Sequence, residues 1–176
     1  MKKRCILIFP EFENVDAINK IRKVYDPLYH KVRPHITLVF PFESYLNTEE
    51  LKNYLLETLK ETKAFKISLY GIVKIQDESG NYLFLKVMDG KEDLIGIHTN
   101  LYKNILKEHK PKWLNNVEFI PHMTIGSFNN KESLENAYKE IHNIQEVFNT
   151  VVKKISVEII DESECSILEM EIELKQ

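Results

Sequence analysis

The apolar positions along the chain follow two periods, which separate strands from helices. Short runs rich in β-branched and aromatic residues, in which apolar and polar positions alternate, predict strands. These runs lie at residues 5–9, 33–42, 64–76, 81–88, 117–128, 148–160 and 165–175. Apolar residues three or four positions apart predict helices instead. These helices lie at residues 13–29, 47–59, 91–110 and 131–146.

The two halves of the chain repeat the same order of elements. Residues 13–88 and residues 91–175 each read as helix, strand, helix and hairpin. The turn sequences DESG at 77–80 and DESE at 161–164 close the two hairpins. No linker rich in Pro, Gly or Ser separates the halves, so we expect two lobes of one domain over residues 1–176.

Composition limits the classes of partner. The 176 residues are 43% hydrophobic and 29% charged, as in an ordinary globular protein. The formal net charge is −3, so no global positive field would attract a long nucleic-acid duplex. No stretch approaches the roughly 20 apolar residues of a membrane span, and the N-terminal apolar run is too short for a signal peptide. We expect a cytoplasmic monomer that binds a small ligand and no membrane.

Two segments share the pattern Pro-His-x-Thr-aliphatic: PHITL at 34–38 and PHMTI at 121–125. In a strand, residues i and i+2 project from the same face, so each histidine shares a face with its threonine. The two faces predicted in this way contain Arg33, His35 and Thr37, and His122, Thr124, Gly126 and Phe128. The opposite, packing faces contain Ile36, Leu38 and Phe40, and Phe119, Met123 and Ile125. Two such motifs in equivalent positions of a repeat indicate a function.

The residue types in the motifs suit a displacement at phosphorus. One imidazole takes a proton from the attacking oxygen, and the other supplies a proton to the leaving oxygen. Each threonine hydroxyl can donate a hydrogen bond to a non-bridging phosphoryl oxygen. No HxH, HExxH or carboxylate cluster accompanies the histidines, so we expect neither a metal ion nor another cofactor.

Four residues are candidates for further substrate contacts. Arg33 shares the His35 face and is suited to bind a phosphate, although a solvated strand-end arginine is an equal interpretation. Lys86 alternates with apolar neighbours in NYLFLKVM and is a candidate to reach the cleft from the hairpin. Tyr82 and Phe128 are candidates to stack on a base, and packing is the plainer interpretation of both. The alternating acidic residues at 169–173 are interpreted as a solvated outer face.

The paired H-x-T-[LI] strands resemble those of the 2H phosphoesterase superfamily, also called the 2′-5′ RNA ligase-like family. The resemblance covers essentially the whole chain, and KVYDPLYHKVRPHITLVFPFE (23–43) is similar to a compact bacterial branch of phosphoesterases. It implies an α+β fold with two lobes, related by a pseudo-twofold axis. In this fold two antiparallel sheets line a central cleft and helices lie on the outside.

The resemblance also implies an activity. Members of the superfamily act without metal on cyclic phosphates or 2′-5′ phosphodiester bonds, and some catalyse reversible 2′-5′ ligation. By motif, His35 would be the general acid and His122 the general base in opening a cyclic phosphate, and Thr37 and Thr124 would contact the phosphate. Cyclic phosphodiesterases of the superfamily often have a glycine soon after the first motif, whereas this chain has LVFPF at 38–42.

We therefore expect a metal-independent phosphoesterase that acts on a small nucleotide-like phosphodiester or an RNA terminus. The alternative is a non-catalytic nucleotide- or RNA-binding module that uses the same cleft. Histidine in both motifs favours the enzyme, because arginine, lysine or asparagine would serve binding alone equally well. A scaffold protein would need an exposed apolar surface, and the periodicity indicates none.

Overall fold

The structure, a computed structural model, describes residues 1–78 and 80–176. Its strands are β1 (Lys2–Ile8), β2 (Ile36–Ser44), β3 (Phe65–Asp77), β4 (Gly80–Val87), β5 (His122–Phe128), β6 (Phe148–Val152), β7 (Lys154–Ile160) and β8 (Ser166–Glu173). Its α-helices are α1 (Val15–Tyr25), α2 (Thr48–Leu59), α3 (Lys91–Leu101) and α4 (Lys131–Ile141). Two 3-10 helices, η1 (Asn104–His109) and η2 (Lys112–Asn115), follow α3.

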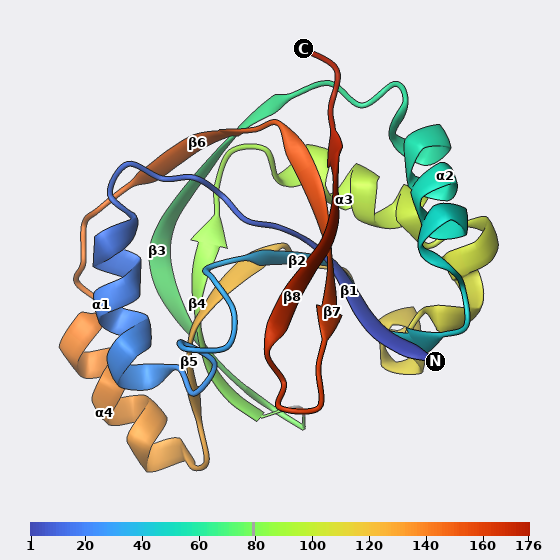
Figure 1. The fold of residues 1–176 in the computed structure, drawn as a ribbon. Helices are drawn as coiled ribbons and strands as arrows, with labels where there is room; N and C mark the ends of the chain where they lie inside the picture. Colours follow the sequence, from blue (N-terminus) through green and yellow to red (C-terminus); the bar gives the residue numbers. More distant parts are fainter. Residues whose placement is uncertain (79) are drawn as a thin grey trace.

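The strands form two four-stranded sheets in which neighbouring strands are antiparallel. The first sheet has the order β2-β1-β7-β8 and the second has the order β5-β4-β3-β6. Helices α1 and α4 lie on one side of the molecule and contact the second sheet, whereas α2 and α3 lie on the other and contact the first (Figure 1). The α+β class with two antiparallel sheets and outer helices, predicted from the sequence, is confirmed.

Each sheet takes strands from both halves of the chain. The first sheet combines β1 and β2 with β7 and β8, and the second combines the β3–β4 hairpin with β5 and β6. Helix α1 likewise contacts β5 of the second sheet, although it belongs to the first repeat. The repeats at 13–88 and 91–175 therefore do not coincide with the two sheets, and the interpretation of each half as one lobe is wrong. Apolar periodicity finds strands, but it does not say which strands pair.

Several predicted elements have different ends. The predicted strand 148–160 is two strands, because the chain leaves the second sheet after Val152 and joins the first at Lys154. The helix predicted over 13–29 ends at Tyr25, where Asp26 is extended, because the residue before a proline disfavours helical geometry. The strand predicted over 117–128 begins only at His122, directly after Pro121, which has no N–H for a sheet. The DESG turn at 77–80 lies partly outside the described residues.

The predicted packing faces are buried. Ile36, Leu38, Met123 and Ile125 are each at most 1% exposed, and they join a core shared by both sheets and the helices. Phe40 is half-buried against the rings of Trp113 and Phe119. In the described part of the chain, no helix combines the length and the apolar character needed to cross a membrane.

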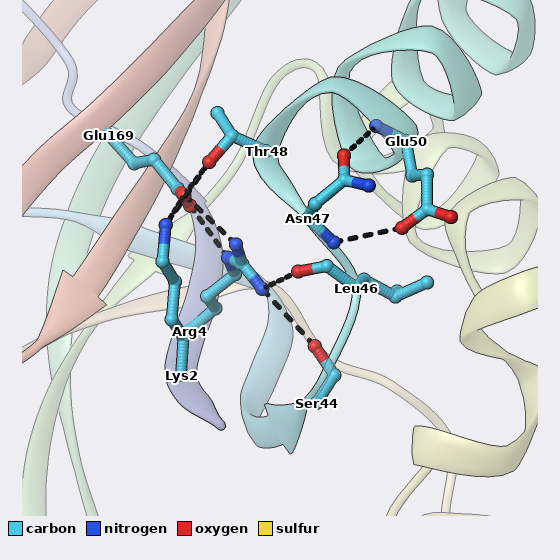
Figure 2. A network of polar contacts seen from close by, with 8 residues as sticks. All are labelled: Lys2, Arg4, Ser44, Leu46, Asn47, Thr48, Glu50 and Glu169. Carbon is cyan, nitrogen blue, oxygen red and sulfur yellow. Dashed lines mark hydrogen bonds and ion pairs between the residues drawn. The ribbon is translucent and has the colours of Figure 1, made fainter.

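A buried ion pair ties β1 to β8 (Figure 2). The fully buried Arg4 donates through Nε to Glu169 Oε2 at 2.6 Å and through Nη2 to Oε1 at 2.9 Å. Lys2 and Thr48 donate to the same carboxylate at 2.8 and 2.7 Å. Arg4 Nη1 also donates to the Leu46 carbonyl at 2.9 Å, just before the start of α2. The network therefore holds three segments together.

Glu169 was assigned to a solvated outer face, and this assignment is wrong. The pairing of β7 with β8 skips one residue, because Val157 lies opposite Met170 whereas Glu158 lies opposite Leu168. Glu169 is the extra residue of this β-bulge, which breaks the alternation along the strand. Its side chain, 5% exposed, consequently faces Arg4. At the start of α2, the predicted helix start is confirmed by a capping box in which Asn47 and Glu50 each accept a hydrogen bond from the other's backbone N–H (Figure 2).

Candidate active site

The two motif strands lie at the place where the sheets meet. β2 is an edge strand of the first sheet, β5 is an edge strand of the second, and the two strands contact each other. Each of these strands begins next to its Pro-His pair. The fold therefore brings the two motifs together, although 87 residues separate His35 from His122 (122 − 35 = 87).

The two imidazoles are held in the same way. His35 Nδ1 lies 2.9 Å from the carbonyl oxygen of Arg33, and His122 Nδ1 lies 2.7 Å from that of Ile120. In both motifs the partner is two residues earlier. A carbonyl only accepts, so the neutral imidazole carries its proton on Nδ1 and leaves Nε2 as the atom for proton transfer.

Both motif strands carry a bulge at the same motif position. In the pairing of β1 with β2, Thr37 lies opposite Leu7 and Val39 opposite Ile6, so Leu38 is the extra residue. In the pairing of β4 with β5, the corresponding extra residue is Ile125. Each bulge directly follows the motif threonine. A bulge adds one residue to a strand and bends it. The residues after the threonine therefore no longer alternate in step with the histidine and the threonine.

The electrostatic environment favours neutral histidines. Burial lowers the pKa of His122 below its ordinary value, and the Ile120 carbonyl offsets part of this effect. Burial also lowers the pKa of His35, against the effect of the Arg33 carbonyl, and the charges of Arg22 and His122 lower it further. The two imidazoles lie on or beside strands that contact each other, β2 and β5.

The first threonine contacts a buried thiol. Burial raises the pKa of the Cys5 thiol, as does the nearby Glu158, whereas a hydrogen bond from Thr37 opposes the rise. Cys5 Sγ donates to the Val39 carbonyl at 3.2 Å. The raised pKa keeps the Cys5 thiol protonated, and as a donor it bonds to the backbone of β2 two residues after Thr37. Thr37 and Thr124 are both half-buried, so their hydroxyls stay within reach of a ligand.

An aromatic stack covers one face of His122. Phe84 on β4 lies parallel to the imidazole, with ring centroids 3.7 Å apart and an interplanar angle of 18°. Tyr82 stacks on the other side of Phe84 at 5.6 Å and 21°. Tyr82 and Lys86 are predicted site residues, whereas Phe84 is not among the predicted ones. The signal was present, because residues 82, 84 and 86 alternate in NYLFLKVM and so share one strand face.

Lys86 flanks the second histidine. It is the strand partner of His122 across β4 and β5, and it is exposed. On its other side, β3 bulges at Gly71, which has a φ of +79°. A Cβ on this glycine would lie 3.0 Å from Lys86 Cε and 3.3 Å from Nζ. The glycine thus leaves room for the lysine side chain, which extends over Gly71, and the role of Lys86 in substrate binding stays a prediction.

Comparison with known proteins identifies the family of the chain. The family model described as "2'-5' RNA ligase superfamily" matches residues 10–164. The chain belongs to this superfamily. A Bacillus licheniformis protein named "Putative phosphoesterase" is 30% identical over 122 residues, which cover 68% of each chain.

Solved structures show the same 2H phosphoesterase fold. One of them, titled "Crystal structure of phosphoesterase", has a TM-score of 0.67 at 13% identity and 100% coverage of both chains. Escherichia coli LigT, solved in complex with 3'-AMP, has a TM-score of 0.64 at 15% identity and 99% coverage of both. At these identities the structures show the fold alone.

Gly126 and Phe128 do not share the face of His122 and Thr124, although the alternation of side chains along the strand predicts that they do. Phe128 packs against Tyr25 of α1, with ring centroids 5.9 Å apart. A Cβ on Gly126 would meet the Phe128 ring at 3.0 Å and Tyr25 Cβ at 3.1 Å, so protein side chains already fill this space. The bulge at Ile125 changes the face of both residues. Phe128 is thus a packing residue and does not join the motif residues.

Arg33 lies on the other side of the first motif. Its guanidinium carbon is 4.0 Å from the centroid of the Phe9 ring, and this ring in turn lies edge-on to His35, with centroids 6.4 Å apart. The arginine itself is exposed. Within residues 1–78 and 80–176, the histidine, cysteine and acidic side chains form no group of three that could hold a metal ion.

Proposed function

We propose that the protein is a metal-independent phosphoesterase of the 2H type. It acts on a cyclic phosphate or a 2′-5′ phosphodiester of a nucleotide or RNA end. The observation that carries this proposal is the matched pair of imidazoles. Each has its Nδ1 bonded to the carbonyl two residues earlier, and the two lie on strands that meet between the sheets.

The reaction divides between the two histidines. In the opening of a cyclic phosphate, His122 Nε2 takes a proton from water as the water oxygen forms a bond to phosphorus. The bond from phosphorus to one ribose oxygen breaks, and His35 Nε2 gives that oxygen its proton. The product is a phosphomonoester, and the two histidines then exchange protons with solvent to restore the starting state. In the reverse direction the two roles exchange.

The surrounding residues stabilise the charge that develops on the phosphoryl group. Thr37 and Thr124 donate to its non-bridging oxygens, and Lys86, the strand partner of His122, supplies a positive charge. Phe84 fixes the plane of His122, so that Nε2 points in one direction. An imidazolium stacked on a ring face also gains a cation–π attraction, which favours the protonated state that His122 reaches during the reaction.

A substrate panel tests this function. The panel contains 2′,3′-cyclic mononucleotides, ADP-ribose 1″,2″-cyclic phosphate, 2′-5′ oligoadenylates and tRNA halves, each with and without EDTA. We expect turnover of at least one of these compounds at a rate that EDTA does not change. Loss of turnover with EDTA would exclude the two-histidine mechanism. A folded protein that binds these compounds but turns none of them over would be the non-catalytic binding module.

The pH dependence of kcat/KM gives a second test. One histidine must be protonated and the other neutral, so the profile is bell-shaped. Burial lowers the pKa of both below the ordinary value of 6.5, so both limbs of the bell lie below pH 6.5. We therefore expect kcat/KM at pH 8 to be about tenfold or more below its maximum. An alkaline limb above pH 7 in the stable folded protein would contradict this assignment.

A further inference from the structure

A cavity adjoins the first histidine. It has a volume of about 760 Å³ and lies between the end of β1, helix α1, the segment before β2 and the start of β8. Its lining includes Phe9, Asn19, Arg22, Lys31, Arg33 and Ser166. A volume in this range is typical of small-molecule sites. Neither motif histidine lines it, so it is a separate space from the proton-transfer site.

An incompletely bonded arginine lies in the wall of this cavity. The Arg22 side chain is 1% exposed, and its Nε donates to Asp26 Oδ2 at 2.7 Å. Nη2 donates to the Val32 carbonyl at 2.9 Å. Nη1 has no hydrogen-bond partner among the described residues. Buried polar groups in proteins are nearly always paired, and a buried charged donor is costly to leave unpaired. Nη1 is itself covered, so an acceptor bound in the cavity reaches it only after a small movement of the neighbouring groups.

Three lining residues of the cavity are cationic, Arg22, Lys31 and Arg33, and Asp26 pairs with Arg22. Arg33 adds a second guanidinium, which the Phe9 ring supports at 4.0 Å. Lys31 also lines the cavity, although it pairs with Glu164 at 2.8 Å. The acidic lining residue is Glu11, whose side chain is 77% exposed and lies 3.7 Å from Lys154. Two arginines with planar, directed donors suit a phosphate group in particular.

The cavity and the first histidine share a wall. Phe9 lines the cavity and contacts the His35 ring, and the carbonyl of Arg33 accepts the hydrogen bond from His35 Nδ1. The pKa of His35, lowered chiefly by burial, is lowered further by the charge of Arg22. A group bound in the cavity would therefore be close enough to belong to the same molecule as the phosphate under attack.

We propose that this cavity binds a second phosphate of the substrate through Arg22 and Arg33. This inference rests on the proposed function. It narrows the substrate class to nucleotides or oligonucleotides that carry a phosphate besides the scissile one, as opposed to a lone nucleoside cyclic phosphate. The buried guanidinium of Arg22 and the exposed guanidinium of Arg33 are the two donors for this phosphate.

Binding of unreactive nucleotides tests the proposal. Calorimetry compares adenosine 2′,5′-bisphosphate with 2′-AMP, and adenosine 3′,5′-bisphosphate with 3′-AMP. In wild type, we expect the second phosphate to tighten binding at least tenfold in one of the pairs, a gain of about 1.4 kcal/mol or more. Arg33→Gln and Arg22→Lys should each reduce this ratio to below about threefold. Arg33 is exposed, so its variant keeps the test valid if Arg22→Lys unfolds.

The control variant is Lys112→Gln, which removes an exposed positive charge on η2 and should keep the wild-type ratio. A ratio near one in wild type, or a ratio unchanged in both arginine variants, overturns the proposal. If the protein turns over a cyclic phosphate but binds bisphosphates and monophosphates equally well, the proposed function holds and the cavity proposal fails. Binding that depends on the arginines, with no turnover of any panel compound, would support the cavity and overturn the function.

Discussion

Replacing His122 by alanine should lower kcat/KM for the preferred phosphodiester by about 10²–10⁴-fold, the usual contribution of a positioned general acid or base. His35→Ala should have an effect of similar size. Both changes remove Nε2, the atom that carries the proton. The two histidines act in one concerted transfer, so the double variant should lose little more than either single variant.

The control for these variants is His142→Ala, at an exposed position at the end of α4. It should retain wild-type kcat/KM. Circular dichroism and thermal unfolding should show that all three single variants remain folded, because neither motif imidazole belongs to the main packed core. Full activity in His35→Ala or His122→Ala would contradict the two-histidine mechanism. If kcat/KM of the double variant falls by the product of the two single factors, the histidines act in separate steps.

Glu169→Gln should destabilise the protein by about 3 kcal/mol, because it leaves a buried guanidinium without its counter-charge. Arg4 is fully buried and donates two hydrogen bonds to this carboxylate (Figure 2). The matched control is Glu173→Gln, an exposed glutamate on the same strand, which should change stability by less than about 0.5 kcal/mol. Urea unfolding followed by circular dichroism measures both. Equal stability of the two variants would show that the network contributes nothing.

The same residue gives a pH signature. The hydrogen bond from Arg4 lowers the pKa of Glu169 from its ordinary value of 4.5 to about 2, against the opposing effect of burial. A carboxyl with a depressed pKa stabilises the folded state above its unfolded pKa, and this stabilisation is lost as the pH falls through the folded pKa. The stability difference between wild type and Glu169→Gln should therefore be constant above about pH 5. It should shrink between pH 4.5 and pH 2.

The candidate site could be predicted from the sequence because the relationship between its histidines and threonines is local. Residues i and i+2 of a strand share a face whatever the strand pairs with, so His35 and Thr37 could be placed together without knowledge of the fold. The same reasoning failed one residue later. The bulges at Leu38 and Ile125 depend on the register of the partner strands, and they removed Phe128 from the predicted site.

The residues that sequence reasoning missed depend on pairing or on distant segments. Glu169 is an ordinary surface glutamate in the pattern of β8 until a bulge turns it toward Arg4, which lies 165 residues earlier. Arg22 is one of several charged residues on α1, and only the tertiary structure shows that its guanidinium is buried beside a cavity. Phe84 could have been predicted, because it alternates with Tyr82 and Lys86 and so shares their strand face.

Each sheet contains strands from both halves of the chain, and this determines which sheet can be completed first during synthesis. The second sheet, which carries His122, is complete once residue 152 has been made. The first sheet must wait, because β1 at the N-terminus pairs with β7, which begins at residue 154. A chain emerging from the ribosome can therefore complete the sheet around His122 while β1, already able to pair with β2, still lacks β7. The strand that follows His35 therefore gains its complete sheet last, and a chain that ends before β7 would have only the two strands β1 and β2 of the first sheet.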